Sequence, residues 1–210
     1  MKLLLHPAYF PNIATYAAIA RSEIVWETHD NYQKQTYRNR CHICTDIGKH
    51  LLTIPIKHTG SRHGRQKYRD VRIDNSYRWQ RLHWRTLQTA YRTSAFFEFY
   101  EDDLAPLYEK KYDLLMEFNF ASIQFLNECL GIQKSTETTE GFVKEPLELN
   151  DARFLIDAKQ HLDFLPRPYF QVFQDRNDFV ANISTLDLLF NEGTNALTYL
   201  KGQTLDFLNA

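Results

Sequence analysis

Cysteine, glycine and proline are scarce in this chain, and long apolar runs are missing from it. Three Cys among 210 residues is an odd and small number, which fits a reducing compartment better than a disulfide scaffold. No apolar run reaches the length of about 18 residues that a membrane span needs. The first residues place only three consecutive Leu before His6 and Pro7, too few for a secretory signal. We therefore expect a cytoplasmic protein.

The remaining composition is that of a globular protein. Hydrophobic residues make up 43% of the chain and charged residues 24%, so the sequence predicts a full apolar core. Aromatic residues are abundant, with 15 Phe and 12 Tyr, which favours recognition surfaces built from rings. We expect a single domain over residues 1–210. The polar, acidic, Thr-rich stretch 135–148 is the best candidate for an internal loop or linker.

Charge is unevenly distributed along the chain, although its net value is −1. Residues 31–93 hold 14 of the 25 Lys and Arg but only three of the 26 Asp and Glu. Such asymmetry indicates a basic segment meant for an anion, for the acidic remainder of the protein, or for both. Within it, residues 57–69 combine two Gly with many cations and hardly an apolar side chain. We expect this stretch to be a mobile loop.

Hydrophobic periodicity and turn signals predict an α/β or α+β fold. We expect a mixed β-sheet flanked by helices in the N-terminal half and a mainly helical C-terminal half. The expected strands are residues 2–5, 23–26, 36–44, 50–56, 70–74, 154–156 and 170–173. The expected helices are residues 13–21, 75–100 and 107–130, with an acidic break at 101–106, and a last helix that begins after Ser184 and ends at 192–193.

The richest stretch in polar recognition groups is residues 31–44, NYQKQTYRNRCHIC. Alternation from residue 36 predicts a strand that presents Arg38 and Arg40 on one face. Two guanidinium groups side by side suit phosphate or carboxylate oxygens, and Lys34 and Asn39 lie close in sequence. A sheet face decorated with solvated charge is an equally good interpretation of this stretch alone.

Three residues are candidates for acid–base chemistry. His6 ends the first expected strand, a common place for a functional residue in an open α/β sheet, although a His satisfied by backbone groups is somewhat favoured. His83 lies between Arg81 and Arg85, whose charges disfavour its protonation, so a neutral base and a packed core His are both open. Glu27 follows the second strand and fits either an ion-pair partner, the favoured interpretation, or a general base.

Aromatic and cationic residues nearby complete the candidate binding set. Tyr9 and Tyr91 are candidates for stacking on a base or sugar ring. Arg85 belongs to an Arg stripe along the expected helix 75–100. The pair Cys41 and Cys44 has the spacing of half a zinc site, but residues three apart on a strand face opposite sides and no second pair follows. We expect neither a metal nor a cofactor.

Several separated motifs resemble the WbqC-like protein family of bacteria. They are HPAYFPNIATYAAI from His6, DNYQKQTYRNRC at 30–41, LLTIPI at 51–56, WQRLHWRTLQTAYRTSAFFEFYEDDL from Trp79, YFQVF at 169–173 and NISTLDLLFNEG at 182–193. They occur in the family's order over most of the chain. The family often has Gln where this chain has His6, a departure that weakens a catalytic assignment for His6. The family also has a second Pro-Tyr at the place where this chain has Ser-Ala-Phe at residues 94–96.

The resemblance implies an enzyme of surface-polysaccharide or O-antigen biosynthesis, a transferase that acts on activated sugars. A basic, aromatic-rich cleft agrees in kind with a nucleotide sugar or another phosphorylated small molecule. A non-catalytic module for anions or single-stranded nucleic acid is the alternative, although the sequence pI of about 6.7 disfavours nucleic acid. A scaffold in which the basic and acidic parts of the chain simply pair is the third possibility.

Overall fold

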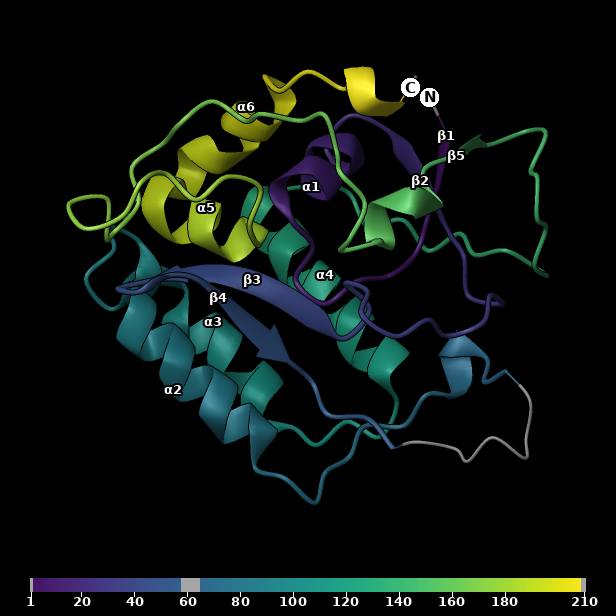
Figure 1. Ribbon diagram of the computed structural model, residues 1–210, viewed down its shortest axis with the longest axis horizontal. Helices are drawn as coiled ribbons and strands as arrows, with labels where there is room; N and C mark the ends of the chain where they lie inside the picture. Colours follow the sequence, from purple (N-terminus) through teal and green to yellow (C-terminus); the bar gives the residue numbers. More distant parts are fainter. Residues whose placement is uncertain (1, 58–64, 209–210) are drawn as a thin grey trace.

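The computed structural model describes residues 2–57 and 65–208 (Figure 1). Its strands are β1 (Lys2–Leu5), β2 (Glu23–Trp26), β3 (Arg40–Thr45), β4 (Gly48–Thr53) and β5 (Asn150–Asp151). Its α-helices are α1 (Ile13–Ile19), α2 (Trp79–Tyr91), α3 (Phe97–Glu109), α4 (Leu115–Leu130), α5 (Thr185–Glu192) and α6 (Ala196–Lys201). Single 3-10 turns lie at Tyr68–Asp70, Arg153–Ile156, Gly193–Asn195 and Asp206–Leu208. The expected mixture of strands and helices is confirmed.

A small parallel sheet of order β2-β1-β5 forms one side of the molecule (Figure 1). The central strand β1 pairs Leu5 with Trp26 of β2 and Leu4 with Asp151 of β5. Its three Leu residues are almost fully buried, as a short continuous apolar run predicts for a strand covered on both faces. Because all three strands run in the same direction, their carboxyl ends meet at one edge of the sheet.

The connection from β1 to β2 is the helix α1. The side chain of Asn12 caps this helix, with Oδ1 accepting the backbone N–H of Thr15 at 3.0 Å. Every residue of α1 is buried, because it packs against α5 and α6 as well as lying beside the sheet. The expected helix, its cap and both flanking strands are confirmed.

The second sheet is the antiparallel hairpin β3–β4, which turns at Gly48 with φ of +89°. Figure 1 shows it between the pair α2 and α3 on one side and α5 on the other. Strand β3 begins at residue 40, not at the expected residue 36. The reason is that the backbone of Tyr37 is hydrogen-bonded to other segments. Its carbonyl accepts from the N–H of Tyr9 at 3.0 Å, and its own N–H donates to the carbonyl of Ile156 at 2.9 Å.

The expected helix 75–100 is wrong as one element, because the chain breaks between α2 and α3. Ser94 turns back onto the end of α2, donating from both its N–H and its hydroxyl to the carbonyl of Tyr91. Phe96 then bonds its N–H to the carbonyl of Phe190 in α5. The expected acidic break at 101–106 is also wrong, since α3 runs through it and holds Pro106 inside its last turn. Helix α6 was not expected.

Three expected strands are absent from the described residues. Residues 70–74 form only isolated bridges, one between Ile56 and Ile73 and one between Arg72 and Leu114. Residues 154–156 belong to a 3-10 turn, and residues 170–173 have no strand partner. Residues 150–151, which were not expected to be a strand, form β5 instead. Val71, Ile73 and Leu155 of these segments are buried in the core, so tertiary contacts override local strand propensity here.

Part of the expected linker is fixed on the parallel sheet. The N–H of Trp26 donates to the carbonyl of Glu137 at 2.9 Å, and the N–H of Thr139 donates to the carbonyl of Trp26 at 3.0 Å. The segment therefore extends the sheet beyond β2 at one point. Of the expected mobile loop 57–69, residues 58–64 lie outside the described residues, and residues 68–70 form a 3-10 turn with Tyr68 buried.

Candidate functional site

The three parallel strands all deliver an ionisable side chain to the same edge of the sheet. His6 follows β1 directly, Glu27 follows β2 directly, and Arg153 comes two residues after β5. Asp30 and Arg38, from the segment after β2, pack between them. We call these five residues the strand-end cluster. Open α/β sheets bind their ligands outside the carboxyl ends of the strands, so this is the place where the fold predicts a site.

His6, Asp30 and Arg38 form a triangle of close polar contacts. His6 Nε2 lies 3.2 Å from Asp30 Oδ2, and Arg38 Nη2 lies 3.0 Å from the same His6 atom and 3.3 Å from the same Asp30 atom. Burial lowers the pKa of His6 below its usual 6.5, and Asp30 opposes this only in part. The imidazole is therefore neutral near pH 7 and can accept a proton.

Arg38 is fully buried, although the sequence predicted an exposed position on a strand. It lies in the turn before β3, so it does not share a strand face with Arg40. Its guanidinium stacks over the ring of Tyr68 at 5.2 Å, and the carbonyl of Arg38 accepts the side-chain amide of Asn119 at 2.7 Å. Asp30 supplies the opposite charge, which is what permits a buried cation.

Glu27 is also fully buried, with its two carboxylate oxygens in different surroundings. Oε1 accepts the backbone N–H groups of His29 at 2.6 Å and Asp30 at 3.1 Å, and the hydroxyl of Thr139 at 3.2 Å. Oε2 lies 3.6 Å from Arg153 Nη1, within ion-pair range but too far for a hydrogen bond. One oxygen is thus held rigidly, and the other is buried without a hydrogen-bond partner among the described residues.

Three polar atoms of the strand-end cluster have no hydrogen-bond partner among the described residues. They are Nδ1 of His6, Oε2 of Glu27 and Nε of Arg38. Buried polar atoms are nearly always hydrogen-bonded, so a concentration of such exceptions at the carboxyl edge of a sheet makes this edge the candidate site. Two of the three atoms belong to groups that can accept a hydrogen bond or a proton.

The cations of the cluster are already matched by carboxylates. Arg153 makes a forked contact to Asp151, at 2.8 Å from Nε and 2.6 Å from Nη2, besides facing Glu27. Arg38 is matched by Asp30. With Glu27, Asp30 and Asp151 against two Arg and a neutral His6, the local balance is slightly negative. The cluster therefore suits a hydroxyl-rich group better than a phosphate.

Two of the predicted site residues, Tyr9 and His83, meet in the core away from the cluster. The Tyr9 hydroxyl lies 2.9 Å from His83 Nδ1 and 3.0 Å from the hydroxyl of Tyr108, and the rings of Tyr9 and His83 stack. Burial lowers the pKa of His83 to about 4, so the expected neutral form has burial, not the neighbouring Arg residues, as its main cause. Both side chains are buried, which agrees with the packed-core alternative for His83 and leaves the Tyr9 ring enclosed, where it is not placed to stack on a ligand.

Tyr91 lies in another buried network. Its hydroxyl donates to Asp187 Oδ2 at 2.8 Å and lies 3.3 Å from the backbone N–H of Cys44, while Tyr169 donates to Asp187 Oδ1 at 2.7 Å. Gln171 adds a third donor to this carboxylate at 3.0 Å. The ring of Tyr91 is thus enclosed and is not placed to stack on a ligand.

The other predicted binding residues are dispersed. Asn39 is a buried structural amide that donates to the carbonyl of Ile54 at 2.9 Å and accepts the hydroxyl of Tyr32 at 3.0 Å. Arg40 begins β3 and is half-buried, with its Nε lacking a partner among the described residues. Lys34 is exposed in a turn. Arg85 is exposed on α2 and lines a cavity whose lining includes neither Arg38 nor Arg40.

Sequence reasoning missed Arg153 and Asp151. Arg153 lies in the acidic remainder of the chain, far from the basic segment, and the two-residue strand that precedes it has no periodic pattern. The sequence offered only a positional signal: Asp151 and Arg153 lie between the polar stretch 135–148 and the apolar residues 154–156. Recognising them required the pairing of β5 with β1.

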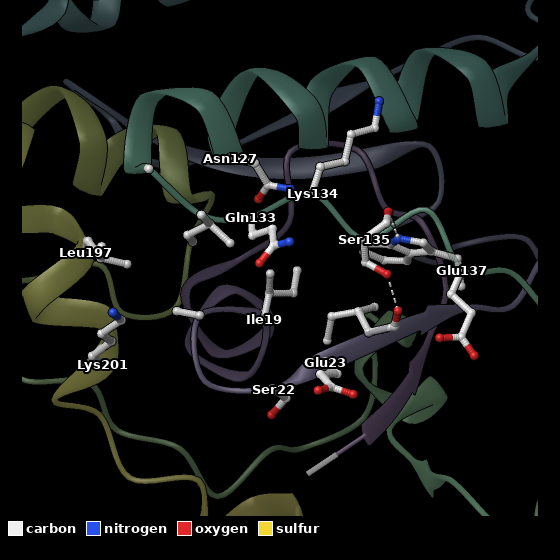
Figure 2. A pocket seen from close by; sticks show the side chains of 15 residues that line it. Ile19, Ser22, Glu23, Asn127, Gln133, Lys134, Ser135, Glu137, Leu197 and Lys201 are labelled. Atoms are coloured by element: carbon white, nitrogen blue, oxygen red, sulfur yellow. Dashed lines mark hydrogen bonds between the residues drawn. The ribbon is translucent and has the colours of Figure 1, made fainter.

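A cavity of about 440 Å³ lies along β2, with Glu23, Ile24 and Trp26 in its lining. Figure 2 shows Glu23 at its edge, with Ile19, Asn127 and Gln133 around its centre and Lys201 reaching in from α6. Ser135 is fixed here by hydrogen bonds of its hydroxyl to Ile24 and of its carbonyl to the indole of Trp26. None of the strand-end residues lines this cavity.

No helix in the described part of the chain is long and apolar enough to cross a membrane. The same residues contain no group of three or more His, Cys, Asp or Glu placed to hold a metal ion.

Comparison with known proteins finds one related protein and one matching family model. The uncharacterized protein Rv1507c of Mycobacterium tuberculosis (strain ATCC 25618 / H37Rv) is 29% identical over 196 residues, covering 81% of this chain and 84% of the relative. No solved structure matches the chain significantly. The model of the WbqC-like protein family matches residues 6–163, a range that includes all five residues of the strand-end cluster. The chain belongs to the WbqC-like protein family.

Proposed function

We propose that this protein is a transferase that acts on a nucleotide-activated sugar or surface-polysaccharide precursor, and that the strand-end cluster holds the sugar. The observation that carries the proposal is the set of buried polar atoms without partners at the carboxyl ends of three parallel strands. Sugar hydroxyls donate and accept at once, so they match the acceptor on Glu27, the donor on Arg38 and Nδ1 of His6 in either tautomer.

The phosphate groups of such a donor need cations that are not already neutralised. Lys67 is exposed, and its Nζ donates to the carbonyl of His29 at 3.1 Å, next to the cluster. Lys34 is exposed in the segment that joins Asp30 to Arg38. The exposed Lys residues at the rim bind the phosphates of the donor, and the buried strand-end cluster binds the hydroxyls of its sugar. This arrangement differs from the expected one, in which Arg38 and Arg40 hold the phosphates.

The proposed reaction moves one proton and exchanges one bond at the anomeric carbon. The hydroxyl of the acceptor loses its proton to a base, its oxygen forms a bond to the anomeric carbon, and the nucleoside diphosphate leaves with the electrons of the bond it breaks. Glu27 Oε2 is the assigned base, because its carboxylate is fixed through Oε1 and stands at the end of β2. His6 positions the acceptor through Nδ1, a role that the Gln frequent in the family also fills.

Release of nucleoside diphosphate from a panel of nucleotide sugars tests this proposal. We expect release with at least one donor, and a loss of about a hundredfold or more in Glu27→Gln. Glu148→Gln changes an exposed residue two positions before β5 and serves as the matched control. Absence of release with every donor, or equal release by Glu27→Gln and wild type, contradicts the proposal.

A non-catalytic anion-binding module is the second candidate. It is favoured by Arg78, directly before α2, and by Arg81 and Arg85 on α2, which are exposed and make no ion pair with any described residue. Binding of single-stranded DNA that weakens steeply with salt, together with no release of nucleoside diphosphate, would favour this reading over the transferase.

A further inference from the structure

A second cavity, of about 460 Å³, lies where the β3–β4 turn meets α2, and we call it the hairpin cavity. Three segments distant in sequence form it: residues 45–50 of the hairpin, residues 85–90 of α2, and residues 173–176. The last segment is tied to the hairpin by Asn177, whose side-chain amide donates to the carbonyl of Thr45 at 3.0 Å. The volume lies within the usual range for a small-molecule pocket.

The walls of the hairpin cavity combine apolar surface with cations from two different segments. Ile47, Ala90 and Phe173 provide the apolar part. Arg85 enters from α2 and Arg176 from the C-terminal segment.

These two cations are not held by strong pairs. The guanidinium of Arg85 makes no hydrogen bond or ion pair with any described residue, and Arg176 contacts only its exposed neighbour Asp175, at 3.7 Å. Such a surface pair is worth little. Asp46 is the one carboxylate of the lining, and His50 and Thr89 add polar groups. Two available guanidinium groups against one carboxylate leave the cavity electropositive.

We propose that the hairpin cavity binds a phosphate monoester that carries an apolar body. The phosphate lies between Arg85 and Arg176, since guanidinium groups match phosphate oxygens in forked pairs. The apolar body covers Ile47 and Phe173. Because Ile47 is 78% exposed, a ligand that covers it removes apolar surface from water. The site shares no residue with the strand-end cluster and does not rest on the proposed transferase activity.

Calorimetric titration with phenyl phosphate, inorganic phosphate and phenol tests the two halves of this recognition. We expect phenyl phosphate to bind more tightly than either fragment. Arg85→Gln and Arg176→Gln each lower its affinity about tenfold to a hundredfold. Arg81→Gln, one turn earlier on the exposed face of α2 and outside the lining, leaves the affinity unchanged. Thr89→Trp fills the cavity without removing a charge and abolishes binding.

Further arms identify the source of the ligand. Tighter binding of adenosine monophosphate than of hexyl phosphate assigns the site to a nucleotide, and the reverse order assigns it to an alkyl or lipid phosphate. The proposal is overturned if none of the phosphate esters binds, or if Arg85→Gln and Arg176→Gln bind phenyl phosphate as wild type does. It is equally overturned if Thr89→Trp, shown to be folded by its melting temperature, binds normally. Glu27→Gln retains this binding, so the two proposals fail independently.

Discussion

His6 Nε2 lies 3.2 Å from Asp30 Oδ2, although the two residues follow different strands of the parallel sheet. The contact exists because β1 and β2 end together and the chain after β2 folds back across that end. Arg38 approaches both atoms, so three ionisable groups share one buried corner. Each of them limits what the others can do: Asp30 neutralises Arg38, and burial keeps His6 uncharged.

Replacing Asp30 with Asn should destabilise the protein by about 3 kcal/mol at neutral pH, because Arg38 is left buried without its carboxylate. Burial alone raises the pKa of Asp30, but the hydrogen bonds from His6 and Asn31 and the charge of Arg38 outweigh it, and the pKa falls below its usual 3.8. A carboxyl group with a lowered folded-state pKa stabilises the protein above the unfolded value, and this contribution is lost as pH falls through the folded value.

Urea unfolding of wild type and Asp30→Asn at neutral pH and below pH 3.8 checks this expectation. The difference between them should shrink in acid. Asp163→Asn, an exposed position without an ion pair among the described residues, is the control and should match wild type throughout. An Asp30→Asn variant as stable as wild type at neutral pH would show that Arg38 does not depend on this carboxylate.

The buried His83 should make stability fall as the solution becomes mildly acidic. Burial lowers its pKa from 6.5 to about 4, so between these values the unfolded chain binds a proton that the folded protein does not. Stability is therefore full above pH 6.5 and decreases as pH falls toward 4, by about 3 kcal/mol for a group so deeply buried. His83→Gln should make this slope shallower, and the exposed His161→Gln should not. The remaining slope comes from His6 and His42, whose pKa values burial also lowers. Identical slopes in both variants would contradict the account.

Asp187 should stabilise the fold mainly by accepting hydrogen bonds and less by carrying a charge. Burial raises its pKa, against the hydrogen bonds of Tyr169, Tyr91 and Gln171. Asp187→Ala leaves these three donors without a partner and should cost about 3 kcal/mol or more in unfolding free energy. Asp187→Asn keeps an acceptor oxygen and should cost clearly less. Chemical denaturation of both variants decides the point, and equal losses would refute it.

Gly193 should tolerate no side chain. It ends α5 with φ of +54°, and a Cβ there would lie 2.6 Å from the ring of Phe96. Gly193→Ala should therefore destabilise the protein by about 3 kcal/mol, combining left-handed strain with the clash. Gly141→Ala is the matched control, since a Cβ there meets nothing within 4 Å. Equal melting temperatures for the two variants would contradict this packing.

Elements that have a clear local signal in the sequence, such as an apolar run or a helix cap, were predicted correctly. The apolar run of β1, the Asn12 cap of α1 and the Ser184 cap of α5 each reproduce the expected element. The break between α2 and α3 was missed because Ser94 and Phe96 are held by tertiary hydrogen bonds that no periodic pattern reveals. Strand β5 was missed because two residues carry no period.

The candidate site was predicted only in part, for a related reason. His6 and Glu27 were found because a strand end is visible in the sequence. Arg38 was placed on a strand face because alternation continues through residues 36–44, whereas its backbone lies in a turn and its side chain is buried beside Asp30. Arg153 was invisible, since only the pairing of β5 with β1 brings it to the same edge.

The most direct test of the strand-end cluster is the affinity of Glu27→Gln for the nucleotide sugar that stabilises wild type most in a thermal-shift panel. The substitution keeps the volume and the accepting oxygen of Glu27 but replaces the oxygen without a hydrogen-bond partner by an NH₂ group. Titration calorimetry should show affinity about tenfold or more weaker in Glu27→Gln and unchanged in Arg85→Gln, which alters only the hairpin cavity. Equal affinity of Glu27→Gln and wild type for that nucleotide sugar would contradict the assignment of the sugar site to the strand-end cluster.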